Sequence, residues 1–550
     1  MRIGRWANDN RISTRSALDY VAEIEYRENR RLIGRRSFLR GVAGIAAIAG
    51  AGVLPRLEKA VANLGLRSRI AIVGGGLAGL VCADRLRSKG ISATIYEANR
   101  RLGGRVSSTR AFPGQVAEKG GELIDNLHKT MLGYAVEFGL AREDLNKAPG
   151  ETVYFFFGQR FSEEEVIDEY RELVARMRPD LKVLGTPTFF HHTAAEAALD
   201  FTDLASYLDS RARDLPLIRA VLDVAYNIEY GLETREQSCL NLLLFIHLDR
   251  RSKFAPFGIF SDERFHVVGG NDRIVTGIAE RLPGLIETGA QLVRLGRNAS
   301  GKYELWFDGA SAPELADAVV LTLPFSVLRD VKLESSLGLS ADKRRAIAEL
   351  TYGANAKTMI GFNGRPWWRT YGCNGDIYSN LSNLQNTWET NWTTAASTAI
   401  LTDYAGGDRG KALQVGSSRS PLPCSRCHGG GNNFFSIDDS VIQQQAEVFL
   451  TDLDKVLPGT KAAATRIDGQ YRVVRGHWLP QSFSRGSYTC NGPGYFTTIA
   501  GLEGQSAGLL KFAGEHTNSF YEWQGFMEGA CLSGIAAADE LLQDIQSGRL

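Results

Sequence analysis

Three glycines and one acid near the start of the sequence have the types and spacing needed to bind a dinucleotide. Gly74, Gly76 and Gly79 stand in G-x-G-x-x-G spacing, and Glu97 follows at about the 20-residue distance typical of such sites. The first glycine allows a tight turn, the second lets the backbone approach a pyrophosphate, and the third lets a helix pack closely. The carboxylate of Glu97 is then placed to bind ribose hydroxyls.

The surrounding residues predict the elements that must position these groups. Residues 70–73 read IAIV, a run typical of a buried parallel strand, and residues 77–88 predict a helix that Gly90 ends. Leu77 and Ala78 begin that helix, whose N-terminus offers free N–H groups and a positive dipole end to phosphates. A second strand, residues 93–96, ends at the acid. Strand, helix and terminal acid together make the glycine pattern specific for a dinucleotide.

The next residues narrow the choice of dinucleotide. They read RLGGR at positions 101–105, so two glycines allow close backbone approach and Arg105 supplies a fixed positive charge. On residue chemistry alone NAD remains possible. The run resembles the G-G-R motif of the flavin-containing amine oxidase family, which follows the ribose acid and touches FAD. The resemblance implies FAD as the cofactor, in contact with Ala98 and Arg105.

A second motif pair near the end of the sequence resembles the same family. Residues 512–517 read FAGEHT, residues 525–530 read GFMEGA, and S-G follows at 533–534. The resemblance implies that Gly514 and Glu515 lie at the ribityl or pyrophosphate region of FAD. It also implies that the following helix directs its N-terminus at the flavin, where it stabilises negative charge.

The two motifs bracket nearly all of the chain after residue 65 and imply its fold class. We expect an α/β protein with a Rossmann-like FAD-binding domain of the GR2 type, discontinuous in sequence, and an α+β substrate domain. The FAD-binding domain is assigned residues 66–125, 265–330 and 500–550, and the substrate domain residues 126–264 and 331–499. Predicted helices in the two domains span residues 163–177, 199–215 and 273–281; predicted strands span 290–293 and 317–324. In relatives the residue at Val293 contacts adenine through its backbone.

A glycine pair, Gly120 and Gly121, resembles the pair that brings backbone near the flavin in amine oxidases. Glu122 follows it directly. Two interpretations of Glu122 remain open, a solvated turn acid and a contact with cofactor or substrate.

Lys357 lies in a predicted strand, residues 355–362, before the aromatic run P-W-W. Taken alone, it predicts a solvent-exposed lysine on an edge strand. Its place in the order of motifs resembles the flavin-side lysine of the family, which holds a water against flavin N5. The resemblance therefore implies a catalytic role for Lys357.

Residues 485–489, RGSYT, resemble the stretch of mammalian monoamine oxidases that carries a flavin-linked cysteine and then a cage tyrosine. Ser487 stands at the cysteine position, so we expect non-covalent FAD, although Cys490 keeps the covalent alternative open. The resemblance makes Tyr488 one wall of an aromatic cage and Phe526 the other. The alternative for both is an aromatic residue of the core.

The resemblance implies an oxidase that removes hydride from the carbon bearing a primary amine or polyamine nitrogen. The imine would hydrolyse to aldehyde and ammonia, and oxygen would become hydrogen peroxide unless a respiratory acceptor replaces it. An L-amino acid oxidase or dehydrogenase, acting on arginine or lysine for example, is the alternative. Amino acid oxidases of the family place an arginine soon after the glycine pair, and residues 121–128 contain none. A flavin-binding but catalytically idle protein is the third possibility.

The composition of the chain excludes one class of partner, and its N-terminal residues predict the cellular location. With 550 residues, 44% hydrophobic content and net charge +1, the chain should form at least two domains and bind no nucleic acid.

Residues 35–40, RRSFLR, precede an apolar run and are typical of a twin-arginine signal. Ala60-Val61-Ala62 is a candidate cleavage site. We expect residues 1–65 to be an extension read by the twin-arginine export machinery, with a periplasmic product or a membrane tether.

Seven cysteines are scattered without a disulfide framework. Cys424, Cys427 and His428 form C-x-x-C-H, the attachment pattern of c-type haem. The surrounding residues are rich in Gly, Ser and Pro, which favours an inserted surface loop over a haem site. We expect no metal site.

Overall fold

The computed structural model of the chain describes residues 69–245, 262–392, 397–414, 439–518 and 523–550. The twin-arginine motif, the candidate cleavage site and the C-x-x-C-H run lie outside these residues. No helix among the described residues has both the length and the apolar character required to cross a bilayer.

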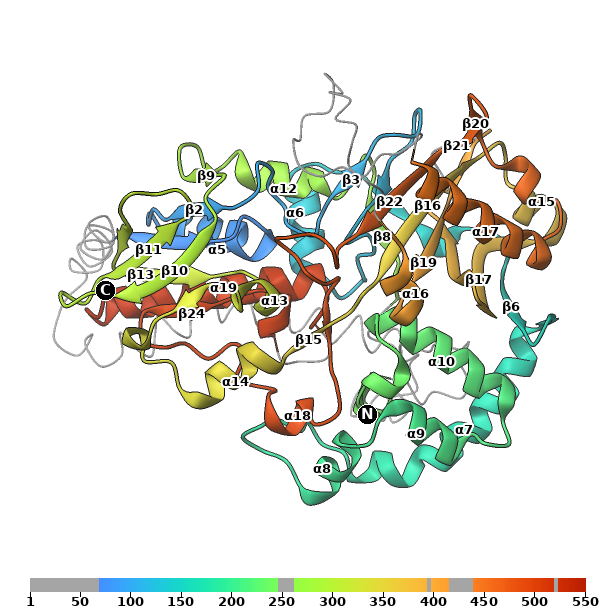
Figure 1. Ribbon diagram of the computed structural model, residues 1–550, viewed down its shortest axis with the longest axis horizontal. Coiled ribbons are helices and arrows are strands. Elements are labelled where there is room, and N and C mark those ends of the chain that lie inside the picture. Colours follow the sequence, from blue (N-terminus) through green and yellow to red (C-terminus); the bar gives the residue numbers. More distant parts are fainter. Residues whose placement is uncertain (1–68, 246–261, 393–396, 415–438, 519–522) are drawn as a thin grey trace, which may run out of the picture.

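A five-stranded parallel sheet gathers strands from the beginning, middle and end of the chain (Figure 1). Its order is β24-β13-β1-β2-β9, and the strands span Leu510–Phe512, Ala318–Leu321, Ile70–Val73, Thr94–Glu97 and Ile286–Thr288 respectively. Strand β1 is fully buried, and all four strand pairs are parallel. The carboxyl ends of these strands therefore meet at one edge, and the expected α/β fold is confirmed.

Two helices from opposite ends of the chain cover this sheet side by side. Helix α5, Leu77–Arg87, packs against α19, Met527–Gln546. Their contact is close because Gly534 has no side chain: a Cβ there would lie 2.3 Å from the carbonyl oxygen of Ala78. Helices α12, Asp272–Ala279, and α6, Lys129–Glu137, pack nearby.

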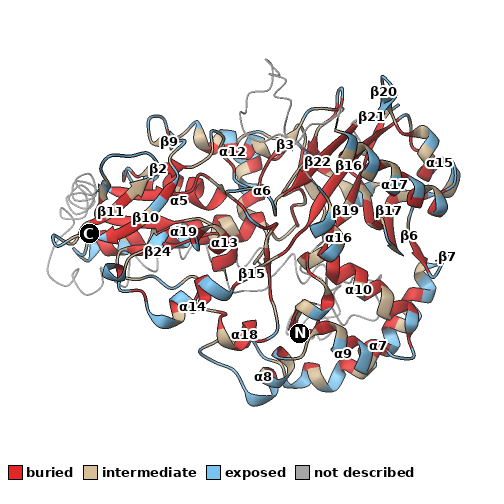
Figure 2. Ribbon diagram, viewed as in Figure 1, coloured by how far each residue is buried: buried red, intermediate tan, exposed pale blue. Residues whose placement is uncertain are grey.

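The other half of the molecule is built on a seven-stranded sheet. Its order is β22-β16-β19-β18-β17-β6-β7, and the strands span Val473–His477, Ala356–Phe362, Ala399–Ala405, Leu384–Glu389, Cys373–Leu381, Glu151–Phe156 and Gln159–Phe161. Helix α17, Ser440–Val456, covers one face with buried side chains such as Phe449. Figure 2 shows the interior of both halves as buried. On the opposite face α10, Pro216–Tyr230, packs against β17, β18 and β6, and the remaining part lines a cavity.

The helical part of this half differs from the sequence expectation. Helix α7 spans Glu163–Val183 and continues past the predicted end through Pro179. The single helix predicted over residues 199–215 is wrong, because the chain forms α8, Ala194–Asp200, and α9, Leu204–Arg211. The side chain of Asp203 accepts a hydrogen bond from the Ser206 N–H at 2.8 Å and so caps a new helix.

The remaining elements connect or flank the two sheets. They include α10, Pro216–Tyr230, β5, Arg142–Asp144, β8, Phe265–Val267, β10, Leu292–Arg297, and β23, Thr489–Cys490. The others are β3, Ser108–Thr109, β4, Ala117–Glu118, β11, Tyr303–Phe307, β12, Glu314–Ala316, β14, Lys332–Leu333, β15, Thr351–Tyr352, β20, Arg466–Ile467, β21, Gln470–Tyr471, α11, Leu240–Phe245, α13, Phe325–Leu328, α14, Ala341–Glu349, α15, Pro366–Tyr371, α16, Gly407–Ala412, and α18, Tyr495–Thr498.

Candidate active site

A cavity of about 1230 Å³ lies between the two halves and is lined by both. At one end its walls come from the carboxyl edge of the parallel sheet, including Gly74, Glu97 and Thr322. At the other end they come from the open face of the seven-stranded sheet, including Lys357 and Tyr404. The cavity therefore joins the predicted cofactor residues to the predicted catalytic residues.

At its two tightest positions, Gly74 and Gly79, the glycine loop excludes any residue with a side chain. Gly74 has φ +113°, where a side chain is strained, and a Cβ on Gly79 would lie 2.0 Å from the Gly74 carbonyl oxygen. Gly76, Leu77 and Ala78 line the cavity, whereas Gly79 lies behind them against the strand. A Cβ on Gly76 would have no neighbour nearer than 3.9 Å, so the loop leaves open space for a phosphate at the start of α5.

Glu97 is held at the mouth of this loop by backbone N–H groups. Its carboxylate accepts hydrogen bonds from Gly75 at 2.6 Å and Asn99 at 2.7 Å. Burial raises the pKa of Glu97, and these hydrogen bonds act in the opposite direction. Glu97 and the adjacent Ala98 both line the cavity, so this carboxylate is available to the ribose of a bound dinucleotide.

The two ends of the chain meet in a charged contact. Arg105 Nη1 donates to Glu515 Oε1 at 2.9 Å and to the Ser487 carbonyl at 2.7 Å. The other carboxylate oxygen of Glu515 accepts from Thr489 Oγ1 at 2.6 Å and from Gly525 N at 3.0 Å. Arg105, Gly514 and Glu515 all line the cavity, so both motifs face one ligand.

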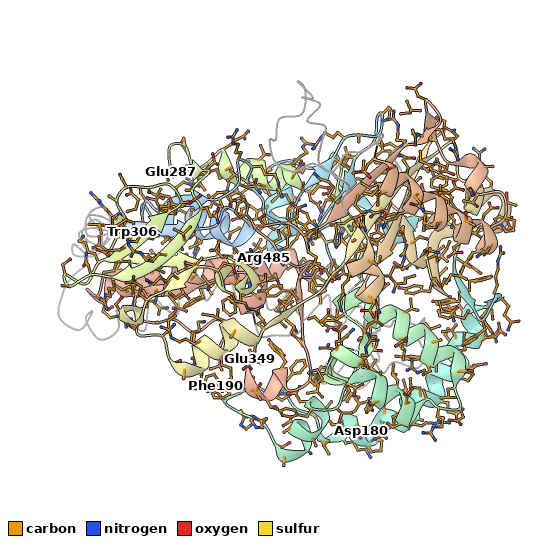
Figure 3. All side chains as sticks on the ribbon, in the orientation of Figure 1. Asp180, Phe190, Glu287, Trp306, Glu349 and Arg485 are labelled. Carbon is orange, nitrogen blue, oxygen red and sulfur yellow. The ribbon has the colours of Figure 1, made fainter. Side chains whose placement is uncertain are left out.

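This end of the cavity fits the FAD that the motifs imply. The phosphates would lie at the glycine loop, and Arg105 supplies positive charge there. Arg100, Arg101 and Arg485 also line the cavity, and Figure 3 labels Arg485 in the central part of the molecule. The free N–H groups of the glycine loop and the arginine side chains around it suit an anionic dinucleotide.

The structure differs from the expectation at Val293. This residue lies in β10, is 36% exposed and does not line the cavity. Residues 290–292 line it instead, because β10 begins at Leu292, two residues after the predicted start, and the segment that passes the cavity lies just before it. None of the five described cysteines lines the cavity; Cys490 is fully buried in β23.

Lys357 lies inside the molecule and not at an exposed edge. It is in β16, between β22 and β19, and is 7% exposed. Its Nζ donates to Glu122 Oε2 at 2.6 Å and to the Gly120 carbonyl at 2.9 Å. The solvated interpretation of Glu122 is thus wrong, since this side chain is 4% exposed and pairs with Lys357. Gly121, next to it, packs against Met527 and leaves no room for a Cβ.

Aromatic side chains surround this pair. Tyr488 and Phe526, the two predicted cage residues, both line the cavity, joined by Tyr404 and Trp388 from neighbouring strands. The hydroxyls of Tyr404 and Tyr488 lie 2.8 Å apart, and the Trp388 and Tyr404 rings meet edge to face at 5.1 Å. Trp388 and Tyr404 are functional candidates that the sequence did not predict, since their only signal was the alternation of side chains along β18 and β19.

Acidic side chains that carry no motif complete the substrate end of the cavity. Glu229 at the end of α10, Glu263 before β8, and Asp376 in β17 all line it. Burial, together with repulsion from Asp376, raises the pKa of Glu263 to about 7. Burial raises the pKa of Asp376 to about 6 and that of Glu229 well above its usual range. A raised pKa keeps a carboxyl group neutral to higher pH, so the substrate end favours a positively charged ligand once Asp376 and Glu263 ionise, at about pH 6 and about pH 7.

Comparison with known proteins gives a consistent result. The sequence model of the family described as flavin containing amine oxidoreductase matches residues 77–542. The chain is 25% identical over 514 residues to the flavin-dependent L-tryptophan oxidase RebO of Lentzea aerocolonigenes, covering 85% of this chain and 97% of that protein. Cyclohexylamine oxidase from Brevibacterium oxydans IH-35A superimposes with a TM-score of 0.70 at 19% identity, covering 87% of this chain and 99% of that one. Putrescine oxidase bound to putrescine gives 0.69 at 18% identity, covering 86% and 99%.

Proposed function

The chain belongs to the flavin containing amine oxidoreductase family, and we propose that within it the protein oxidises amines that carry no carboxylate. As a member of this family it is an FAD-dependent enzyme that acts on CH–NH₂ donors. The finer proposal is a primary amine or polyamine as donor and oxygen as acceptor, so that the products are an imine and hydrogen peroxide.

The proposal depends most on the acidic side chains at the substrate end of the cavity. A substrate carboxylate there would meet the acids Glu229, Glu263 and Asp376. The cation Lys357 is already paired with Glu122. The guanidinium of Arg475 is 1% exposed and donates to Gln414 and Gln445. Ionised like charges placed together cost several kcal/mol. A carboxylate should therefore be rejected and an ammonium attracted above the raised pKa values of Asp376 and Glu263, about 6 and about 7.

The residues of the cavity can prepare an amine for oxidation. Bound FAD supplies the redox chemistry by accepting a hydride at its ring system. The aromatic walls of Tyr488, Phe526 and Tyr404 remove water from the amine and so favour its neutral form, which can release hydride. The same walls restrict the orientation of the substrate C–H bond. The acids described above attract the charged amine before it loses its proton.

A substrate screen tests the proposal. Peroxide formation should be measured with putrescine, spermidine and tyramine, and with arginine and lysine as their carboxylated counterparts. We expect kcat/KM for the best amine to exceed that for either amino acid by about 100-fold, the equivalent of about 2.7 kcal/mol. Faster oxidation of arginine or lysine would overturn the proposal. Flavin reduced by an amine without oxygen uptake would instead indicate another electron acceptor.

An L-amino acid oxidase is the second candidate. The similarity to RebO, an L-tryptophan oxidase, over 97% of that protein favours it. L-tryptophan therefore belongs in the same screen, paired with tryptamine, which differs only by lacking the carboxylate. A preference for tryptophan over tryptamine would favour this second candidate directly.

We also propose that FAD is bound without a covalent link. Ser487 stands where covalent relatives carry cysteine, and its Oγ donates to Asn355 Oδ1 at 2.6 Å. The five described cysteines lie away from the cavity walls. Acid precipitation of the enzyme should leave the yellow colour in the supernatant. Flavin retained in the pellet would contradict this proposal.

Export through the twin-arginine pathway is proposed from the sequence alone. The support is the RRSFLR run before an apolar segment. Replacing Arg35 and Arg36 together by Lys should retain the enzyme in the cytoplasm, as measured by cell fractionation. Equal periplasmic activity in both forms would contradict it.

A further inference from the structure

The contacts of Glu122 go beyond a simple ion pair with Lys357. Glu122 Oε2 accepts from Lys357 Nζ at 2.6 Å, while Glu122 Oε1 accepts from Trp388 Nε1 at 3.1 Å. The three residues come from the glycine-pair turn, β16 and β18, which lie far apart in sequence. One carboxylate thus fixes a cation and an indole ring relative to each other.

The ammonium of Lys357 has one donor left after these contacts. An ammonium carries three N–H donors. One points to Glu122 and one to the Gly120 carbonyl at 2.9 Å. The Lys357 Nζ also lies 5.2 Å from the centre of the Trp388 ring and 5.9 Å from that of Tyr404. Because Lys357 lines the cavity, the third donor is available to a water or ligand there.

Burial makes this arrangement rigid. Lys357 and Glu122 are 7% and 4% exposed, and breaking a buried pair by removing one partner is strongly unfavourable. The carboxylate accepts on both oxygens and the ammonium donates twice to the protein. Neither group can turn away without leaving a buried charge unsatisfied.

We propose that Glu122 is a positioning residue that fixes the Lys357 ammonium in place, so that its third donor is presented to the cavity where the flavin binds. The inference depends on FAD, which the family shares, and not on the substrate proposed above. It assigns Glu122 no contact with the reacting atoms. The alternative is an ion pair that stabilises the fold and has no effect on flavin chemistry.

The reaction of reduced flavin with oxygen separates these possibilities. The enzyme can be reduced with dithionite and mixed with oxygen in a stopped-flow instrument, so no amine is needed. We expect Glu122→Gln to slow reoxidation about tenfold at pH 7.5. We also expect its rate to fall at a lower pH than in the wild type, because a buried ammonium without a counter-ion is disfavoured. Glu122→Asp should restore part of the rate.

A double-mutant cycle identifies the route of the effect. If Glu122 acts through Lys357, adding Glu122→Gln to Lys357→Met should change the reoxidation rate less than twofold. The absorption spectrum of oxidised FAD should shift in both single variants and no further in the double variant. FAD content and Tm are measured for each variant.

Two results would overturn the inference. One is a Glu122→Gln variant with lower Tm but an unchanged pH profile and flavin spectrum, which describes a purely structural pair. The other is an additive effect in the double variant, which means that Glu122 acts independently of Lys357. If Glu122→Gln fails to fold, the cycle is repeated with Glu122→Asp, for which the same two results decide.

Discussion

The two ends of the cavity differ in the charged side chains that the motifs and strands bring to their walls. The end at the parallel sheet is lined by Arg100, Arg101 and Arg105, whereas the end at the seven-stranded sheet is lined by Glu229, Glu263 and Asp376, among others. FAD is an anion, and an amine substrate is a cation when it arrives. The contrast shows that one continuous cavity can sort two ligands by charge before any specific contact forms.

The ends also differ in how they are built. The cofactor end depends on backbone shape, with a glycine at φ +113° and another whose Cβ would clash at 2.0 Å. The substrate end depends on side chains from separate strands, held by hydrogen bonds such as that between Tyr404 and Tyr488 at 2.8 Å. Changes to the glycines at the first end should be all-or-none, and changes to side chains at either end should be graded.

The largest effect is expected at the cofactor end. Gly79→Ala places a Cβ 2.0 Å from the Gly74 carbonyl, which backbone cannot accommodate without moving the loop. We expect protein with less than about a tenth of the normal flavin content, read from the absorbance ratio at 450 and 280 nm as an order-of-magnitude estimate. Gly133→Ala is the matched control, because this glycine is also helical and its Cβ would meet nothing within 4 Å. A Gly79→Ala protein that keeps its flavin colour would contradict the view that backbone shape decides binding at the cofactor end.

The Arg105–Glu515 contact should give the next largest effect. Arg105→Met removes a charge from a partly buried pair at 2.9 Å whose side chains are 22% and 5% exposed. We expect the Kd for FAD to rise about tenfold or more, as measured by titrating apoprotein. Arg100→Met, an exposed residue of the same cavity wall, should have a smaller effect. Equal effects would indicate general attraction without a specific role for Arg105.

A graded change is expected at the substrate end. The double variant Glu263→Gln/Asp376→Asn neutralises two acids while keeping their shapes. We expect KM for putrescine, a dication, to rise about tenfold and KM for tyramine about threefold or less, because the second ammonium loses its attraction. An equal rise for both amines would show that the acids act on the reacting amine alone.

The smallest effect is a pH dependence of the same wall. The pKa of Glu263 is raised to about 7 and that of Asp376 to about 6, so both groups lose protons between pH 5.5 and 8. The wall becomes more negative as pH rises, and KM for putrescine should fall about threefold over this range. The profile should flatten in the double variant. A KM that rises with pH in the wild type would contradict the charges assigned to this wall.

The nucleotide half could be predicted from sequence because its constraints are local. A tight turn requires Gly74, and close helix packing requires Gly79, within ten residues of the strand they follow. The helix predicted over residues 199–215 failed for a local reason, because Asp203 caps a new helix that begins at Leu204. Val293 lies outside the cavity.

The sequence alone therefore determined a dinucleotide site, through motifs in which neighbouring residues restrict the backbone, and the resemblance of those motifs to amine oxidases implied FAD. Only the tertiary structure decided the environment of Lys357. Its strand lies between two others, and Glu122, 235 residues away, supplies its counter-ion. The physical reason is that backbone conformation is set by residues close in the chain, whereas burial and charge pairing depend on which distant segments pack together.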